Sequence, residues 1–110
     1  MAQYQQIVLL RFAPSTDRET IAEIFEALDE LPAQIPGVIE VRGGPYNSPA
    51  GLNKGFTHAF VVTLADEQAR DACLEHPAYT RLQQLILAQL SGGLADLIAF
   101  DFKDCARFRY

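Results

Sequence analysis

The sequence has little of what nucleic acids, membranes or a disulfide framework would require. Its 110 residues include no tryptophan, two cysteines, and nine basic residues against fourteen acidic ones, which gives a net charge of −5. Binding to phosphates needs clustered lysine and arginine, and only Lys103, Arg107 and Arg109 approach a cluster. No apolar run reaches the length of about 18 residues that a membrane-spanning helix needs. We therefore expect neither a nucleic acid nor a membrane as a partner.

Features of secretion and of metal binding are also missing. The first six residues lack the charged start and apolar stretch of a signal peptide. Cys73 and Cys105 form no CxxC pair, which fits a reducing, cytoplasmic location. No two histidine, cysteine or carboxylate residues have the spacing of metal ligands, so we predict no metal and no cofactor.

Apolar patterns and turn residues divide the first half of the chain into two strands and a helix. Residues 6–12 are apolar without alternation and stop at Ala13-Pro14, as in a strand that is buried on both faces. Thr16, with Glu19 three residues later, matches a capping box and predicts a helix that ends near Leu31, before Pro32. Residues 38–42 form a short second strand, and the glycine-rich stretch 43–55 is a loop that could act as a flap over a cavity.

The second half repeats this alternation. Residues 56–64 form a third strand, with Phe56, His58, Phe60, Val62 and Leu64 on one face. Asp66 can cap a helix that runs to about Glu75, and His76-Pro77 begins another that closes at Gly92-Gly93. Residues 94–102 form the last strand. We therefore place a single domain at residues 1–102 and an exposed tail at residues 103–110.

The order β-α-β-β-α-β predicts an α+β, ferredoxin-like fold, in which a split βαβ unit forms a four-stranded antiparallel sheet. One layer of helices covers one sheet face, yet the strands at 7–10 and 97–100 are apolar on consecutive positions. Burying even about 500 Å² of the other face would contribute on the order of 12 kcal/mol before association costs. A second copy of the chain could cover that face through a two-fold contact, so we expect a homodimer with its sheets face to face.

Five segments together resemble the stress-responsive A/B barrel (Dabb) family. They are residues 6–12 (QIVLLRF), 35–38 (IPGV), 55–58 (GFTH), 76–79 (HPAY) and 98–102 (IAFDF). The resemblance spans residues 5–102. It implies a dimeric α+β barrel with a cavity between each sheet and its own helices. More distantly it implies kinship with olivetolic acid cyclase-like polyketide cyclases, which close a ring without a cofactor.

The same resemblance assigns roles to individual residues. The catalytic histidine of the cyclases falls on Tyr79, and their pocket tyrosines fall on Leu28 and Cys73. His58 is the remaining polar residue of that pocket. We expect Phe25 in the first helix and Phe60 beside His58 to complete the substrate-binding surface.

His58 and Tyr79 are the candidate catalytic residues. His58 lies in the middle of a strand, where burial lowers the pKa of an imidazole and leaves it neutral as a general base. A core histidine that is hydrogen-bonded to a backbone carbonyl or to a neighbouring residue is the alternative. The phenol of Tyr79 could donate to a developing enolate, or could simply fill the core. Gln6 lies either on the cavity face, where its amide could position a ligand, or at a solvated strand end.

Three functions remain open from sequence alone. The first is a dimer that binds a small apolar or phenolic molecule. The second is a cofactor-independent cyclase or isomerase with His58 as its base. The third is a cofactor-free monooxygenase.

Overall fold

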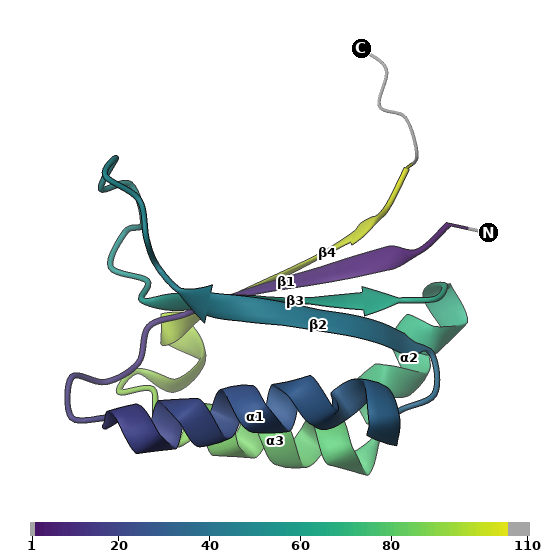
Figure 1. The fold of residues 1–110 in the computed structure, drawn as a ribbon, viewed down its shortest axis with the longest axis horizontal. Helices are drawn as coiled ribbons and strands as arrows, with labels where there is room; N and C mark the ends of the chain where they lie inside the picture. The colour runs from purple at the N-terminus through teal and green to yellow at the C-terminus, as the bar shows by residue number, and fades with distance from the viewer. Residues whose placement is uncertain (1, 106–110) are drawn as a thin grey trace.

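A four-stranded sheet with all its helices on one face makes up the computed structural model, which describes residues 2–105 (Figure 1). Neighbouring strands are antiparallel, in the order β2-β3-β1-β4. The strands are β1 (Tyr4–Leu10), β2 (Val38–Pro45), β3 (His58–Leu64) and β4 (Leu97–Lys103). The helices are α1 (Arg18–Gln34), α2 (Glu67–Glu75) and α3 (Pro77–Leu87), and a short 3-10 turn, η1 (Gly93–Asp96), precedes β4. The predicted ferredoxin-like α+β fold is confirmed.

Alternation along the strands gives the sheet two different faces. On the helix side, Val8 of β1 lies between Phe60 of β3 and Ala99 of β4. Side chains of this set are buried on β1 and β3, as the predicted alternation of residues 56–64 requires. The opposite set points away from the helices, and we call it the open face. Its apolar members are Ile7, Leu9, Ala59, Val61, Ile98, Phe100 and Phe102.

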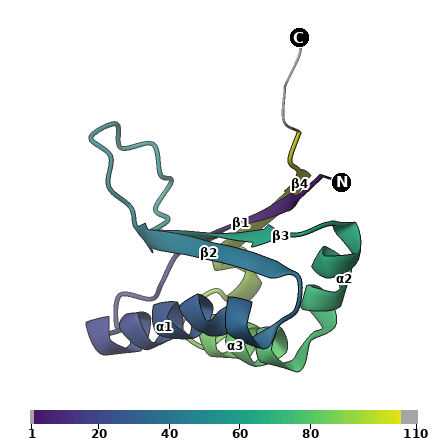
Figure 2. The same cartoon turned by 45° about the vertical axis from the view of Figure 1, so that its right-hand side comes forward.

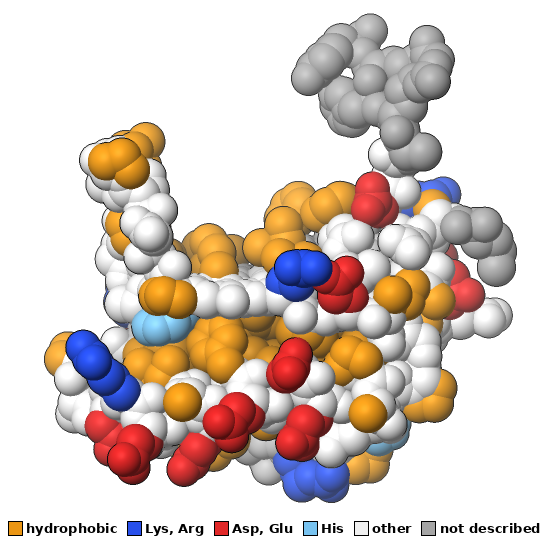
Figure 3. Space-filling view, in the orientation of Figure 1, with side chains coloured by type: hydrophobic (Ala, Val, Ile, Leu, Met, Phe, Trp, Pro, Cys, Tyr) orange, Lys and Arg blue, Asp and Glu red, His pale blue; other side chains and the backbone are white. Residues whose placement is uncertain are grey.

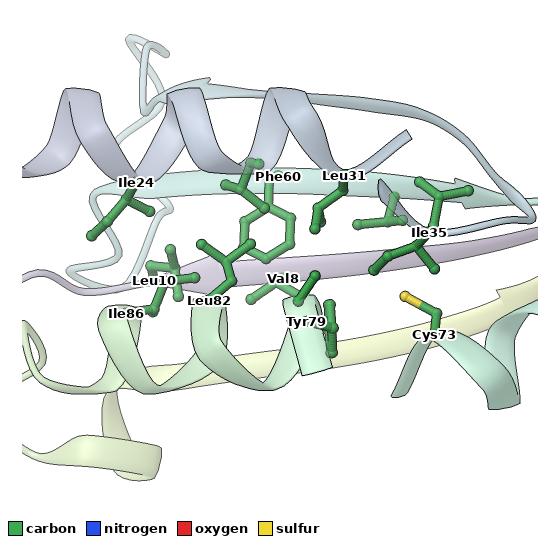
Figure 4. Packing of buried hydrophobic residues seen from close by; sticks show 14 of the residues in the cluster. Val8, Leu10, Ile24, Leu31, Ile35, Phe60, Cys73, Tyr79, Leu82 and Ile86 are labelled. Carbon is green, nitrogen blue, oxygen red and sulfur yellow. The ribbon is translucent and has the colours of Figure 1, made fainter. Parts of the chain in front are cut away.

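The core lies between the helix side of the sheet and the paired helices α1 and α3, which run side by side beneath it (Figure 2). Ile24 and Leu31 of α1, Leu82 of α3 and Leu10 of β1 meet there with little or no exposure (Figure 4). Gly43 of β2 allows the side chains of α1 to pack closely against the sheet. A β-carbon added at Gly43 would lie 2.8 Å from the Phe25 ring and from Cβ of Phe60, so no larger side chain fits.

The first helix begins and ends differently from the prediction. Its N-cap is Asp17, whose carboxylate accepts from the Thr20 N–H at 2.8 Å, and not Thr16. The Thr16 hydroxyl lies instead 3.3 Å from the Gln89 carbonyl oxygen. The helix also continues through Pro32 to Gln34, because a proline in the last turn removes one hydrogen bond and the turn still closes with Ile35 N–H on Leu31 O. The predicted cap Asp66 is confirmed, and the helix predicted to begin at His76-Pro77 has His76 as its N-cap.

Several strand boundaries also shift. Strand β2 includes Gly43 and Gly44, and β3 begins at His58 and not at Phe56, so the loop spans residues 46–57 in place of the predicted 43–55. Residues 94–96, predicted as strand, belong to the 3-10 turn. Lys103 is part of β4, and the Asp104 N–H donates to Gln3 O at 2.8 Å, so the predicted tail begins too early. Residues 106–110 of that tail, with Arg107 and Arg109, lie outside the described residues.

Candidate functional site

A mostly apolar cavity lies between the sheet and helices α2 and α3, and we call it the helix-side cavity. Its volume is about 420 Å³. It reaches the surface beside β4, where Ala99 is exposed although it faces the helices. Most of the lining is apolar, and the polar groups are Gln6, Tyr79, Gln83 and Asp101. The apolar lining consists of Val8, Phe60, Leu74, Leu82, Ile86, Leu87, Leu94, Leu97 and Ala99.

Gln6 and Tyr79 form a buried polar pair in this cavity. Each is 4% exposed, and the Tyr79 hydroxyl donates to Gln6 Oε1 at 2.5 Å. Gln6 lies within β1 on the helix side. Of its two predicted positions, the one on the cavity face is therefore correct, and the one at a solvated strand end is wrong. Burying these groups would be costly without the hydrogen bond between them. The bond leaves the amide NH₂ of Gln6 and a lone pair of the phenol oxygen for a bound molecule.

The environment of Tyr79 keeps its phenol protonated. Burial is the main cause that raises the pKa of Tyr79 to about 12. At neutral pH the group is therefore a hydrogen-bond donor and acceptor, and it cannot serve as a base. The close-up of the core shows Tyr79 beside Val8 and Leu82, at the end of α3 nearest α2 (Figure 4).

An ion pair borders the same cavity. Asp101 of β4 faces the helices directly opposite Gln6, with which it pairs across the sheet. Its Oδ2 lies 3.2 Å from Nη1 of Arg70 in α2, whose guanidinium also lies 5.2 Å from the centre of the Tyr4 ring. Hydrogen bonding to Asp71 is the main cause that raises the pKa of Arg70. The pair thus places a carboxylate at the cavity wall while balancing its charge.

His58 lies at a different place. It pairs with Leu10 in the sheet, four residues beyond Gln6 along β1, or about 13 Å at the rise of a strand. It lines a pocket of about 320 Å³ beside the β2–β3 loop, which we call the loop pocket. The rings of Phe12 and Phe25 flank it at 5.0 and 5.8 Å, and burial lowers its pKa. The lining of the helix-side cavity does not include His58.

The other predicted site residues are also divided between locations. Phe60 lines the helix-side cavity together with Gln6 and Tyr79. Phe25 and Leu28 border a groove between α1 and β2 instead. Cys73 is 2% exposed in the core, where burial is the main cause that raises the pKa of its thiol to about 11. Of the seven residues predicted for one site, three therefore share a cavity.

Sequence reasoning missed Asp101, although the pattern of the last strand contained a signal for it. Ile98, Phe100 and Phe102 alternate on one face, which places Ala99 and Asp101 on the other. A carboxylate on the helix side of an otherwise apolar strand indicates either a buried ion pair or a polar wall of a cavity. Here it is both.

Within residues 2–105 no three histidine, cysteine or acidic residues come together in a way that could hold a metal ion. In the same part of the chain no helix combines the length and apolar character needed to cross a membrane.

Comparison with known proteins identifies the family of the chain. The family model described as "Stress Responsive A/B Barrel Domain" matches residues 5–104. No functionally curated protein matches the chain significantly.

Solved structures with the same fold include both uncharacterised proteins and an enzyme. A dimeric ferredoxin-like protein of unknown function from Jannaschia sp. CCS1 is 24% identical, with a TM-score of 0.84, over 93% of this chain and 99% of that one. The Arabidopsis thaliana protein At3g17210 is 22% identical, with a TM-score of 0.85, over 96% and 99%. A hydroxynitrile lyase from Passiflora edulis is 17% identical, with a TM-score of 0.85, over 97% of each chain. At these identities the likeness concerns the fold.

Proposed function

The chain belongs to the stress-responsive A/B barrel domain family, and from that premise we propose that it is a homodimer that binds a small, largely apolar molecule in the helix-side cavity of each copy. The ligand carries at least one hydroxyl or carbonyl group, as a phenolic compound does. The observation that carries this proposal is the Gln6–Tyr79 pair, buried at the wall of a cavity that is otherwise mainly apolar.

The cavity has the composition of a small-molecule site. Binding sites are concave and mostly apolar, with a few polar groups that fix the orientation of the ligand. At about 420 Å³ the cavity lies within the usual range of roughly 300 to 1,000 Å³. The Gln6 amide can donate to a ligand oxygen, while the phenol oxygen and the Asp101 carboxylate can accept from a ligand hydroxyl.

The open face supports the homodimer. Phe100 is 63% exposed and Ile98 is 45% exposed in a single copy, among further apolar side chains of the same face. The space-filling view shows apolar side chains rising above the sheet on the side away from the helices (Figure 3). A contiguous apolar surface of this kind marks an interaction site. The related structure from Jannaschia sp. CCS1 is itself described as dimeric.

The geometry gives the catalytic alternative less support. A cyclase or lyase mechanism with His58 as base and Tyr79 as donor needs both groups within hydrogen-bond reach of one substrate. Tyr79 is bonded to Gln6, whereas His58 pairs with Leu10, four residues or about 13 Å farther along β1, and the lining of the helix-side cavity does not include His58. The Passiflora edulis lyase shows that this fold can host an enzyme, but its likeness to this chain is one of fold.

Binding of 2-naphthol, an apolar bicyclic phenol, tests the proposal, with naphthalene as the analogue that lacks the hydroxyl. We expect NMR titration to show saturable binding of 2-naphthol, with shifts at Tyr79 and Leu82. Naphthalene should bind about fivefold more weakly, because one hydrogen bond contributes about 1 kcal/mol. Ala99→Phe should abolish the binding, since it fills the cavity mouth.

Ile98→Phe is the matched control, because it places the same side chain one residue away on the open face. It should leave the affinity for 2-naphthol unchanged. Equal loss of binding in both variants, or shifts confined to open-face residues, would assign the ligand to another surface and contradict the proposal.

A further inference from the structure

The β2–β3 loop, residues 46–57, stands on the open side of the sheet and not over the helix-side cavity. Both ribbon views show it rising from one end of the sheet, away from the helices (Figures 1 and 2). It therefore cannot act as the flap over that cavity which the glycine-rich sequence allowed. Any partner that covers the open face has to meet this loop.

The loop is braced in its raised conformation. The Tyr46 hydroxyl donates to Ser48 O at 2.8 Å and accepts from the Gly51 N–H at 3.0 Å. At the base, Arg11 donates to Lys54 O at 2.9 Å and lies over the Phe56 ring at 4.6 Å. A loop that already holds its bound shape loses little conformational entropy when a partner docks.

The inner side of the loop is apolar and continuous with the open face. The loop pocket has Leu9 and Ala59 of the open face as its floor and Tyr46 and Leu52 of the loop in its wall. Leu52 is 72% exposed in a single copy. Lys54 is the one charged residue between positions 46 and 57, so the loop offers little to a charged partner.

We propose that the 46–57 loop is a clamp that grips a second copy of this chain, with Leu52 packing against the partner and the loop pocket receiving apolar side chains of the partner's open face. This inference rests on the proposed homodimer and adds a specific partner contact to it. In a two-fold dimer each copy supplies one clamp, so a single substitution removes two contacts.

Subunit exchange between two fluorescently labelled populations of the full chain measures how strongly the loop holds the partner, because loss of an interface contact acts mainly on the dissociation rate. Leu52→Ser should speed the exchange at least about tenfold, as loss of a buried anchor does. Leu52→Met, which keeps the apolar volume, should exchange within about twofold of the wild type.

Leu94→Ser is the matched control, since Leu94 is also 72% exposed but lines the helix-side cavity. It should leave the exchange rate unchanged. Exchange by Leu52→Ser within about twofold of the wild type would overturn the clamp while the homodimer stands. A wild-type chain that sediments as a monomer at all concentrations would overturn the homodimer itself, and the clamp with it.

Discussion

At the residue scale, the pair formed by Gln6 and Tyr79 sets the chemistry of the cavity. Each side chain satisfies one polar group of the other, so both can be buried without an uncompensated loss of solvation. The remaining hydrogen-bonding capacity lies at the wall of the cavity, where we propose that it selects the ligand. The neutral state of Tyr79 is essential to this role, because a phenolate would repel the nearby Asp101 carboxylate.

The raised pKa of Tyr79 predicts a specific loss of stability in alkali. Unfolded tyrosine has a pKa near 10, and burial raises that of Tyr79 to about 12. Between these values the unfolded chain releases a proton that the folded chain retains, so stability falls as pH rises. In the wild type the free energy of unfolding should therefore fall between pH 8 and pH 11. In Tyr79→Phe this fall should be smaller by about 1 kcal/mol, as measured by urea unfolding across the same pH range.

Cys73 contributes a fall of the same sign, because burial raises the pKa of its thiol to about 11 from an ordinary value of 9. The Tyr79→Phe variant should therefore retain part of the alkaline decline. Identical pH profiles for the variant and the wild type would show that the phenol titrates freely in the folded chain.

The sequence predicts individual residues less well than it predicts their faces. The period of two along β1 places Gln6 with Val8 on the helix side, but whether that end is covered depends on α3, far along the chain. His58 illustrates the same limit. It belongs to the helix-side set, as predicted, yet its position at the start of β3 places its ring beside Phe12 and Phe25, toward the opposite end of the sheet from the Gln6–Tyr79 pair.

At the element scale, local patterns predict the order and kind of every helix and strand, and tertiary contacts then move their ends. Thr16 and Asp17 can both cap a helix. The Thr16 hydroxyl is instead near Gln89, a contact across 73 residues that no local pattern contains, and Asp17 takes the cap. Asp66 has no such competing contact among its hydrogen bonds, and its predicted cap is confirmed.

The cap at Asp66 is a sensitive point, because α2 has nine residues and is too short to be stable alone. The Asp66 carboxylate accepts from the Ala69 N–H at 2.8 Å. Asp66→Ala should lower the free energy of unfolding by about 1 kcal/mol in urea titrations, and Asp66→Asn should retain most of the stability. The helix also carries Arg70, so the alanine variant should loosen the ion pair with Asp101.

Equal stability of Asp66→Ala and the wild type would mean that packing alone holds the first turn of α2. If Asp66→Asn lost as much stability as Asp66→Ala, the negative charge of Asp66 would be what stabilises the helix, and not the oxygen that accepts the capping hydrogen bond.

At the scale of the whole molecule, one layer of helices leaves the sheet half covered. The helix side is covered by α1 and α3, whereas the open face carries half-buried aliphatic side chains from β1 and β3 and exposed aromatic and aliphatic side chains from β4. The edge strand β2 is more polar on this face, where it presents Glu40 and Arg42. A contact between two copies would therefore be centred on the other three strands. The sequence predicts this imbalance because consecutive apolar residues in a strand need cover on both faces.

Val61→Asp places a charge near the centre of the proposed contact, between Ile7 and Arg42 in the sheet. The chain should stay folded, because this side chain faces away from the core. The dimer should be lost, because two carboxylates per dimer would be buried at a cost of several kcal/mol each, and Arg42, the cross-strand neighbour of position 61, is already paired with Glu40. Sedimentation velocity at micromolar concentrations, together with circular dichroism, measures both outcomes.

Leu85→Asp is the control for this substitution, since it introduces the same charge at an exposed leucine of α3, on the other side of the molecule. That variant should remain dimeric, because the helix layer takes no part in a contact between open faces. A dimer that survives Val61→Asp but dissociates in Leu85→Asp would place the contact on the helices. The apolar surface of β1, β3 and β4 would then require a different partner, because its exposure follows from the fold of a single copy.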